Sequence, residues 1–161
     1  MIVKCLGILT LLSITLYFCY ELTMLEKRRL RQTEGFLLLL RHIRAEISCF
    51  CSPLCEIFDA FQNESLEECG FLSALKSSNL SEAIEKTRSR IYLEQEEINM
   101  LGALASQLGS SYRDQQIELC DYYIGEFENL FTKTREEHPK RSKLCRGVVL
   151  TGGLMLIIVL I

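Results

Sequence analysis

Apolar residues form one long run at each end of the chain, and a charged segment separates the two runs. Residues 1–20 carry a single charged side chain, Lys4, and residues 147–161 carry none. At 1.5 Å per residue the first run gives about 30 Å of helix, enough to cross the hydrocarbon core of a bilayer. Because this run ends in bulky residues and not in a small-x-small cleavage motif, it predicts an uncleaved anchor.

The second apolar run is shorter and gives only about 22 Å of helix. A helix that begins at Leu144, with the stem of Arg146 extended into the interface, reaches about 27 Å. Local thinning of the bilayer absorbs the remaining mismatch at modest cost. We therefore predict transmembrane helices at residues 1–24 and 144–161, and the alternative for the second is an apolar tail buried in a partner protein.

Lysine and arginine cluster on the flank of each apolar run that faces the middle of the chain. The clusters are Lys27, Arg28, Arg29 and Arg31 after the first run, and Lys140, Arg141, Lys143 and Arg146 before the second. Positively charged flanks stay on the cytoplasmic side of a membrane, so both clusters place residues 25–143 in the cytoplasm.

The segment between these two clusters, residues 32–139, has 9 basic and 19 acidic side chains. This balance argues against nucleic-acid binding, because neutralising phosphates requires a basic face. The acidic surplus has two interpretations, a solvated surface or a dock for a basic partner.

The middle of the chain has helical periodicity and no strand pattern of useful length. Two apolar stripes repeat at spacings of three and four residues. They are Phe36, Leu40, Ile43, Ile47 and Phe50, and Ile117, Cys120, Ile124, Phe127, Phe131 and Thr134. The first stripe continues the N-terminal anchor, and the second suits antiparallel packing against it. We predict an all-α fold, a cytoplasmic helical bundle between an N-terminal and a C-terminal transmembrane helix.

Five local signals divide this segment into helices. Ser52-Pro53 ends the first stripe, with the proline at the first position of the next helix. Ser65-Leu66-Glu67-Glu68 and Asn79-Leu80-Ser81-Glu82 have the pattern of capping boxes. Gly109 follows the apolar stripe of residues 98–108, where a left-handed cap belongs. His138-Pro139 predicts a break or kink before the second span.

No group of residues points to catalysis, a metal or a cofactor. Cys49, Cys51 and Cys55 are the only cluster that resembles a metal site, but structural zinc requires four ligands. His42 lies two helical turns from Cys49, too far to serve as its base. We interpret the cysteines as small apolar residues in a reducing compartment. Nucleotide-binding glycine loops are absent from the sequence, so we predict neither an enzyme nor a small-molecule substrate.

Charged clusters within the bundle have a surface interpretation and a functional one. Glu94, Glu96 and Glu97 suit a solvated helix face better than an acid–base pair. Arg88 and Arg90, together with Lys86, form the one basic patch remote from the predicted spans. This patch is either a salt-bridged surface or a contact with a partner protein.

The chain resembles the stage III sporulation protein AB family of endospore-forming bacteria from end to end. The anchor with its basic flank comes first. The likeness then rests on Arg44-Ala45-Glu46-Ile47, Ser52-Pro53-Leu54-Cys55-Glu56, Leu108-Gly109-Ser110-Ser111 with Gln115-Gln116, and Lys143-Leu144-Cys145-Arg146-Gly147 with Gly152-Gly153-Leu154. Two departures are Tyr112, where the family commonly has aspartate, and the cysteines around Phe50. The resemblance marks Glu46, Pro53, Leu54, Leu108, Gly109 and Gln116 as family-motif or interface positions, beside Arg88 and Arg90.

The resemblance implies a structural role in the channel that joins mother cell to forespore during sporulation. It implies kinship with the inner-membrane platform proteins of type II secretion and type IV pilus systems. The implied partners are the sporulation ATPase, stage III sporulation protein AA, and other channel components, on the mother-cell side of the cell membrane. The alternative is a two-span scaffold protein of another secretion or envelope complex.

Overall fold

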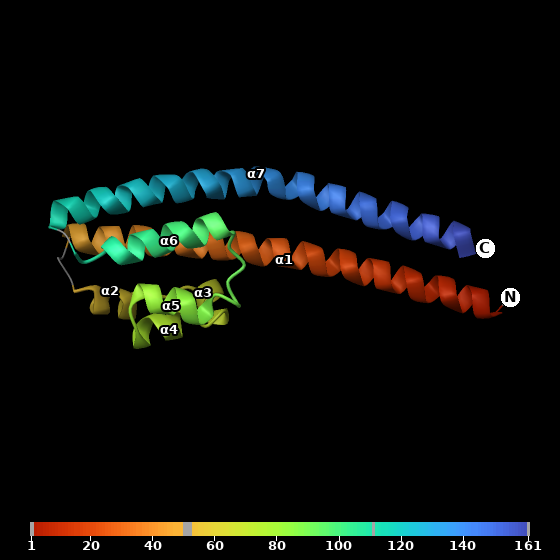
Figure 1. Cartoon of the computed structure of the whole chain (residues 1–161), viewed down its shortest axis with the longest axis horizontal. Coiled ribbons are helices and arrows are strands. Elements are labelled where there is room, and N and C mark those ends of the chain that lie inside the picture. The colour runs from red at the N-terminus through yellow and green to blue at the C-terminus, as the bar shows by residue number, and fades with distance from the viewer. Residues whose placement is uncertain (1, 50–52, 111, 161) are drawn as a thin grey trace. The chain divides into compact units, whose positions relative to one another are not determined.

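The chain is helical almost throughout. The computed structural model describes residues 2–49, 53–110 and 112–160, with side chains at only some positions of 2–12 and 137–160. These residues form seven helices and no strand (Figure 1). The helices are α1 (Ile2–Cys49), α2 (Leu54–Ala60), α3 (Glu64–Glu68), α4 (Phe71–Ser77), α5 (Leu80–Thr87), α6 (Gln95–Gln107) and α7 (Arg113–Leu160). The predicted all-α fold is confirmed.

Two compact units share the long helices α1 and α7. One unit consists of Met1–Lys27 with Thr134–Ile161, and the other is Arg28–Lys133. The prediction that the first stripe continues the N-terminal run in one helix is confirmed, because α1 extends unbroken over 48 residues. Of the two predicted outcomes at His138-Pro139, the break is wrong, because α7 is helical on both sides of it, and the kink stays a prediction. Proline removes one backbone hydrogen bond, and a long helix retains the others.

Among the residues that the structure describes, no helix is both long and apolar enough to cross a membrane. Many positions of the predicted spans 1–24 and 144–161 lie outside the described side chains. Both spans stay a prediction.

The unit Arg28–Lys133 has one hydrophobic core, and α1 passes through it. Consecutive α1 residues point about 100° apart, yet Phe36, Leu37, Leu39 and Leu40 are all at most 4% exposed. This segment is therefore covered on most of its sides. Figure 1 shows α7 on one side of it and α2 to α5 on the other, while α6 is drawn across α1.

Both predicted stripes belong to this core. Ile43 and Ile47 complete the α1 stripe at 0% and 6% exposure, while Phe50 lies outside the described residues. On α7, Cys120 and Phe127 are fully buried, and Ile117, Ile124 and Phe131 pack against the same core half-buried. Ion pairs flank the contact of the two helices, Arg41 with Glu128 at 2.6 Å and Arg44 with Asp121 at 2.9 Å.

The short helices begin where small polar side chains cap them, although not always at the expected residue. Asn79 Oδ1 accepts a hydrogen bond from the Glu82 N–H at 2.8 Å, which confirms the predicted start of α5. The predicted cap Ser65 is wrong, because α3 begins at Glu64 and Asn63 is its N-cap. Either residue type can cap a helix, so composition alone does not choose between neighbouring candidates. Pro53 is the N-cap of α2 and Leu54 its first residue, so the helix begins one residue later than predicted.

Ser65 instead joins α3 to α1 at Gly35. The Ser65 hydroxyl lies 3.1 Å from the carbonyl oxygen of Arg31 and 2.8 Å from Asn63 Oδ1. A Cβ on Gly35 would lie only 2.8 Å from Ser65 Oγ and 2.9 Å from Asn63 Oδ1. Only glycine lets α3 approach α1 this closely, because any side chain would separate the two helices.

A buried polar cluster joins α1 to the start of α6. Glu97 is 1% exposed, so the predicted solvated face is wrong for this residue, while Glu94 and Glu96 are exposed. Glu97 Oε1 lies 3.2 Å from the Thr33 hydroxyl, and Oε2 accepts from the Glu94 N–H at 2.7 Å, one half of a capping box. Arg29 reaches Glu94 at 2.6 Å and Glu97 at 3.8 Å. Burial raises the pKa of the Glu97 carboxyl, because removal from water disfavours its charged form, although Arg29 and these hydrogen bonds oppose the shift.

The close approach at Gly35 predicts that Gly35→Ala destabilises the protein by about 1–3 kcal/mol, the usual range for overpacking. The matched control is Gly125→Ala on α7, where a Cβ meets nothing within 4 Å. This change should stabilise by about 0.5–1 kcal/mol, because alanine favours helix over glycine. Thermal melts followed by circular dichroism give both values. Equal melting temperatures for the two variants would contradict the packing at Gly35.

The buried carboxyl predicts a pH dependence. With a raised pKa in the folded chain, the native state binds the Glu97 proton more tightly than the unfolded state, so stability falls as pH rises from about 4.5 through the folded pKa. Glu97→Gln should abolish this fall, because glutamine does not ionise. Glu96→Gln, at an exposed position of the same helix, should retain it. Urea denaturation at a series of pH values measures the difference, and parallel profiles for Glu97→Gln and the unmodified chain would refute it.

Candidate functional site

The two turns that carry most of the family-motif positions meet at one end of the unit Arg28–Lys133. Gly109 has a φ of 83°, which confirms the predicted left-handed cap after α6. A Cβ on Gly109 would lie 3.1 Å from Leu54 Cδ1, at the start of α2. A substituted side chain would therefore suffer both backbone strain and a tight contact. We call this place, where α1 leads to α2 and α6 leads to α7, the connection end (Figure 1).

Arg113 ties the connection end together and was missed by the sequence analysis. It is the first residue of α7, and its Nε donates to the carbonyl oxygen of Ile47 at 3.1 Å. Its Nη2 donates to the carbonyl oxygen of Ser48. The last carbonyls of α1 have no partner within their helix and carry partial negative charge, so a guanidinium group is well suited to them. The available signal was a basic residue at the start of a helix expected to run antiparallel to α1.

The remaining connection-end positions surround this contact. Leu108 closes α6, with its N–H donating to the Leu104 carbonyl oxygen at 2.9 Å, and is half-buried against the core. Glu46 and Gln116 are half-buried and lie one residue and three residues from Ile47 and Arg113, respectively. Six of the eight predicted positions therefore gather at the connection end. They are Glu46, Pro53, Leu54, Leu108, Gly109 and Gln116.

Tyr112 is the most exposed large apolar residue of the described chain, at 86%. It directly precedes Arg113 at the connection end. The ring of Tyr112 is a large apolar surface that is not buried by the rest of the folded chain. This exposure makes Tyr112 the strongest candidate for contact with another protein at the connection end.

Arg88 and Arg90 lie elsewhere, in the loop between α5 and α6. This loop precedes α6 and the Leu108–Gly109 turn follows it, so the 13 residues of α6, about 20 Å, separate the two places. Arg88 Nη2 donates to Gln95 Oε1 at 2.5 Å, and Lys86 pairs with Glu82 at 3.6 Å. The salt-bridged interpretation of the patch therefore applies to Lys86, while both arginines are exposed.

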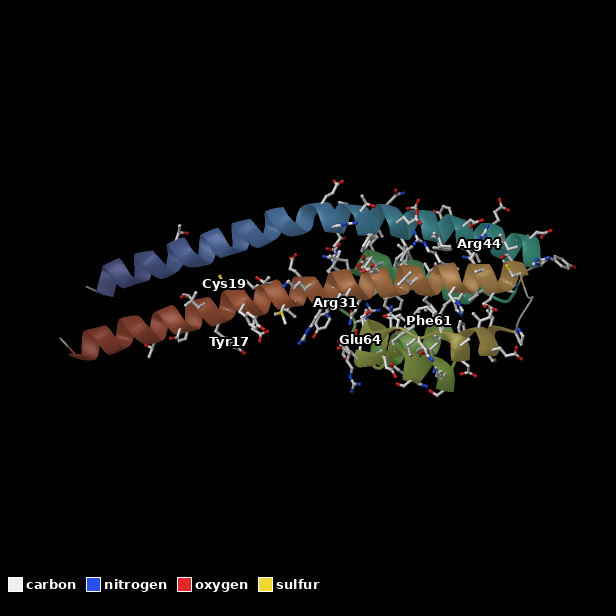
Figure 2. The ribbon with its side chains drawn as sticks, turned by 180° about the vertical axis from the view of Figure 1, so that it is seen from behind. Tyr17, Cys19, Arg31, Arg44, Phe61 and Glu64 are labelled. Carbon is white, nitrogen blue, oxygen red and sulfur yellow. The ribbon has the colours of Figure 1, made fainter. Side chains whose placement is uncertain are left out.

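The acidic surplus gathers partly around α3. A hollow of about 480 Å³ is lined by Gln62, Asn63, Glu64, Glu67 and Glu68. Figure 2 shows Arg31 of α1 near Glu64 of α3, and both residues line a neighbouring hollow. Polar and charged side chains dominate both linings, whereas small-molecule sites are usually largely apolar.

The cysteines differ in their environments. Cys69 and Cys120 are buried, and burial raises the pKa of both thiols, that of Cys120 to about 11. The interpretation as small apolar residues holds for these two. It is wrong for Cys49 and Cys55, which are exposed because they lie next to the connection between α1 and α2.

Within the described residues, no group of three or more histidine, cysteine or acidic side chains is placed to hold a metal ion. Cys51, the middle member of the only candidate cluster, lies outside these residues. The expectations that the chain binds no metal and catalyses no reaction stay predictions.

Comparison of the chain with curated protein sequences and with solved structures gives no match. The sequence model of the family described as stage III sporulation protein AB matches residues 4–161. The two motif turns that meet at the connection end lie inside this match, as do the second apolar run and all but the first three residues of the first. The chain belongs to the stage III sporulation protein AB family.

Proposed function

We propose that this protein is a non-catalytic platform of the mother cell–forespore channel, anchored in the cell membrane by both chain ends. Its helical unit lies in the mother-cell cytoplasm and docks the secretion-type sporulation ATPase. The family supports the sporulation role. The apolar ends with their basic flanks support the anchoring and the orientation.

The observation that carries the docking proposal is the meeting of the motif turns. Residues 54 and 109 are far apart in the sequence but in contact in the fold. Arg113 then fixes the start of α7 on the end of α1. Tyr112, beside this contact, offers the exposed aromatic group that frequently carries the binding energy of protein interfaces. The connection end is therefore the proposed docking surface.

A scaffold role in another secretion or envelope complex is the second candidate. It shares the anchoring and the orientation and differs only in the partner. The family favours the sporulation channel, because its description names a sporulation stage.

The proposed orientation predicts the pattern of thiol labelling in cells. Cys49 and Cys55 are exposed and should react with a membrane-impermeant maleimide only after permeabilisation. Cys69 and Cys120 are buried and should stay unlabelled until the protein is denatured, which makes them internal controls. Mass spectrometry of the separate peptides reads out each site. Labelling of Cys49 or Cys55 in intact cells would refute the cytoplasmic placement.

The proposed dock predicts that Tyr112→Ser weakens capture of the ATPase by at least tenfold, the loss typical of an aromatic interface anchor. The matched control is Tyr122→Ser, which removes the same side chain from the α7 surface, where it is 61% exposed. Co-purification from detergent extracts, with titration of the ATPase, gives both affinities. Tyr112→Ser should retain the melting temperature of the unmodified chain. Tyr122→Ser should lower it slightly, because the Tyr122 ring packs edge-on against the buried Tyr123 with 5.2 Å between the ring centroids, so both affinities are compared on folded protein.

Three other results would contradict the proposal. Equal loss for Tyr112→Ser and Tyr122→Ser would move the contact away from the connection end. Loss of capture with Arg88→Glu, and none with Tyr112→Ser, would assign docking to the basic patch. If the unmodified chain does not capture the ATPase, the ATPase is not its partner. That result would favour a scaffold role in another secretion or envelope complex.

A further inference from the structure

We propose that the loop between α5 and α6 forms, with the adjoining segment of α1, a basic surface that binds the anionic phospholipid headgroups of the membrane. The surface consists of Arg28 and Arg31 on α1 and Arg88, Arg90 and Tyr92 on the loop. This inference rests on the membrane anchoring proposed above and is independent of the ATPase.

A buried glutamine brings the two parts of the surface together. Gln32 is 4% exposed, and its Nε2 donates to the carbonyl oxygen of Arg90 at 3.3 Å. Its Oε1 accepts from the Tyr92 N–H at 2.7 Å. The side-chain amide thus makes two hydrogen bonds with the loop backbone and binds the loop to α1. Residues about 60 positions apart in the sequence become neighbours, next to the basic cluster that follows the predicted anchor.

The side chains around the two hydrogen bonds of Gln32 are exposed cations. Arg28, Arg31, Arg88 and Arg90 are all exposed, while Arg29 is used internally by Glu94 and Glu97. Arg90 Nη1 lies 3.3 Å from the position of a Cβ on Gly70, so its guanidinium extends over the turn between α3 and α4. The carboxylates near Arg31 are Glu34, Glu64 and Glu68, which line a hollow with it. Arg90 lies close to the same acidic segment, because both Arg90 and Glu68 act electrostatically on the Cys69 thiol.

Position along the chain favours lipid as the partner. Arg28 and Arg31 follow the predicted span by four and seven residues, about 6 and 10 Å of helix. The headgroup layer is about 5–8 Å thick on each side of the core, and the surface potential extends a further Debye length of about 8 Å. Gln32, which holds the loop, lies about 12 Å of helix beyond the end of the predicted span. The long side chain of an arginine on the loop covers the distance from there to the headgroups.

The chemistry of the loop supports the same partner. Arginine offers a planar fork of N–H donors that matches phosphate oxygens. Tyr92, 39% exposed, adds the type of aromatic side chain that is enriched at membrane interfaces. The sequence presented Arg88 and Arg90 as remote from the spans, and only the fold returns them to the basic end of α1.

The test uses the full chain in lipid nanodiscs of phosphatidylcholine alone or with increasing phosphatidylglycerol. Hydrogen exchange of the amides of residues 88–93 should slow as the anionic fraction rises, and 0.5 M salt should reverse the effect. The turn at residues 108–110 serves as the internal reference and should exchange at the same rate in all discs. Equal exchange of residues 88–93 in both kinds of disc would overturn the proposal.

Substitutions assign the effect to the surface. Arg88→Gln with Arg90→Gln should raise the phosphatidylglycerol fraction needed for half protection, since each basic residue near an anionic surface strengthens association by about fivefold. Arg41→Gln with Lys76→Gln removes two other exposed cations and should leave the titration unchanged. A shift with the control pair as large as with the arginine pair would show a net-charge effect and refute the specific surface.

Two outcomes distinguish this proposal from the membrane anchoring on which it rests and from a protein partner at the same surface. A chain that does not stay with the nanodiscs would refute the anchoring itself, whatever the exchange of the loop. Protection of residues 88–93 that needs the added ATPase, and is equal in both kinds of disc, would assign the surface to a protein partner and overturn the lipid contact.

Discussion

The burial of one segment of α1 is the constraint on which the helical unit depends. Phe36, Leu39, Leu40 and Ile43 are at most 1% exposed, so α1 must be covered on several sides at once. No single partner helix can do this, because a neighbouring helix covers only one stripe. The second long helix α7 covers one side, and four short helices between residues 54 and 87 cover another. The short helices owe their stability to this contact, since helices of five to eight residues are unstable alone.

Because this segment of α1 is so completely buried, the polar interactions around it determine where the other elements lie along the helix. Thr33 and Arg29 meet Glu97 near the start of α6, Gln32 holds the loop before α6, and Arg113 satisfies the last carbonyls of α1. Each joins α1 to an element more than fifty residues away. An unpaired polar group in these places would be costly, so these contacts fix the position of each element along α1 as well as its presence.

The two ends of α6 consequently have different surroundings. One end follows a loop rich in exposed arginine beside the basic segment of α1. The other leads to the connection end, where Leu54 meets Gly109 and Tyr112 is exposed. The proposed platform requires one surface for the membrane and one for its partner. The 13 residues of α6, about 20 Å of helix, separate the two candidate surfaces.

Local chemistry in the sequence determined the helical class, the two apolar stripes, the cap at Asn79 and the left-handed Gly109, because these depend on periodicity and on single residue types. The sequence did not decide whether Asn63 or Ser65 caps α3, since that depends on the approach of α3 to Gly35. The start of α4 at Gly70 gave no clear signal, because glycine is an ambiguous start residue. The burial of Glu97, the capping of α1 by Arg113 and the return of Arg90 to Gln32 were decided only by the tertiary structure. Each pairs residues more than fifty positions apart, and no local pattern records which distant partner a polar side chain will meet.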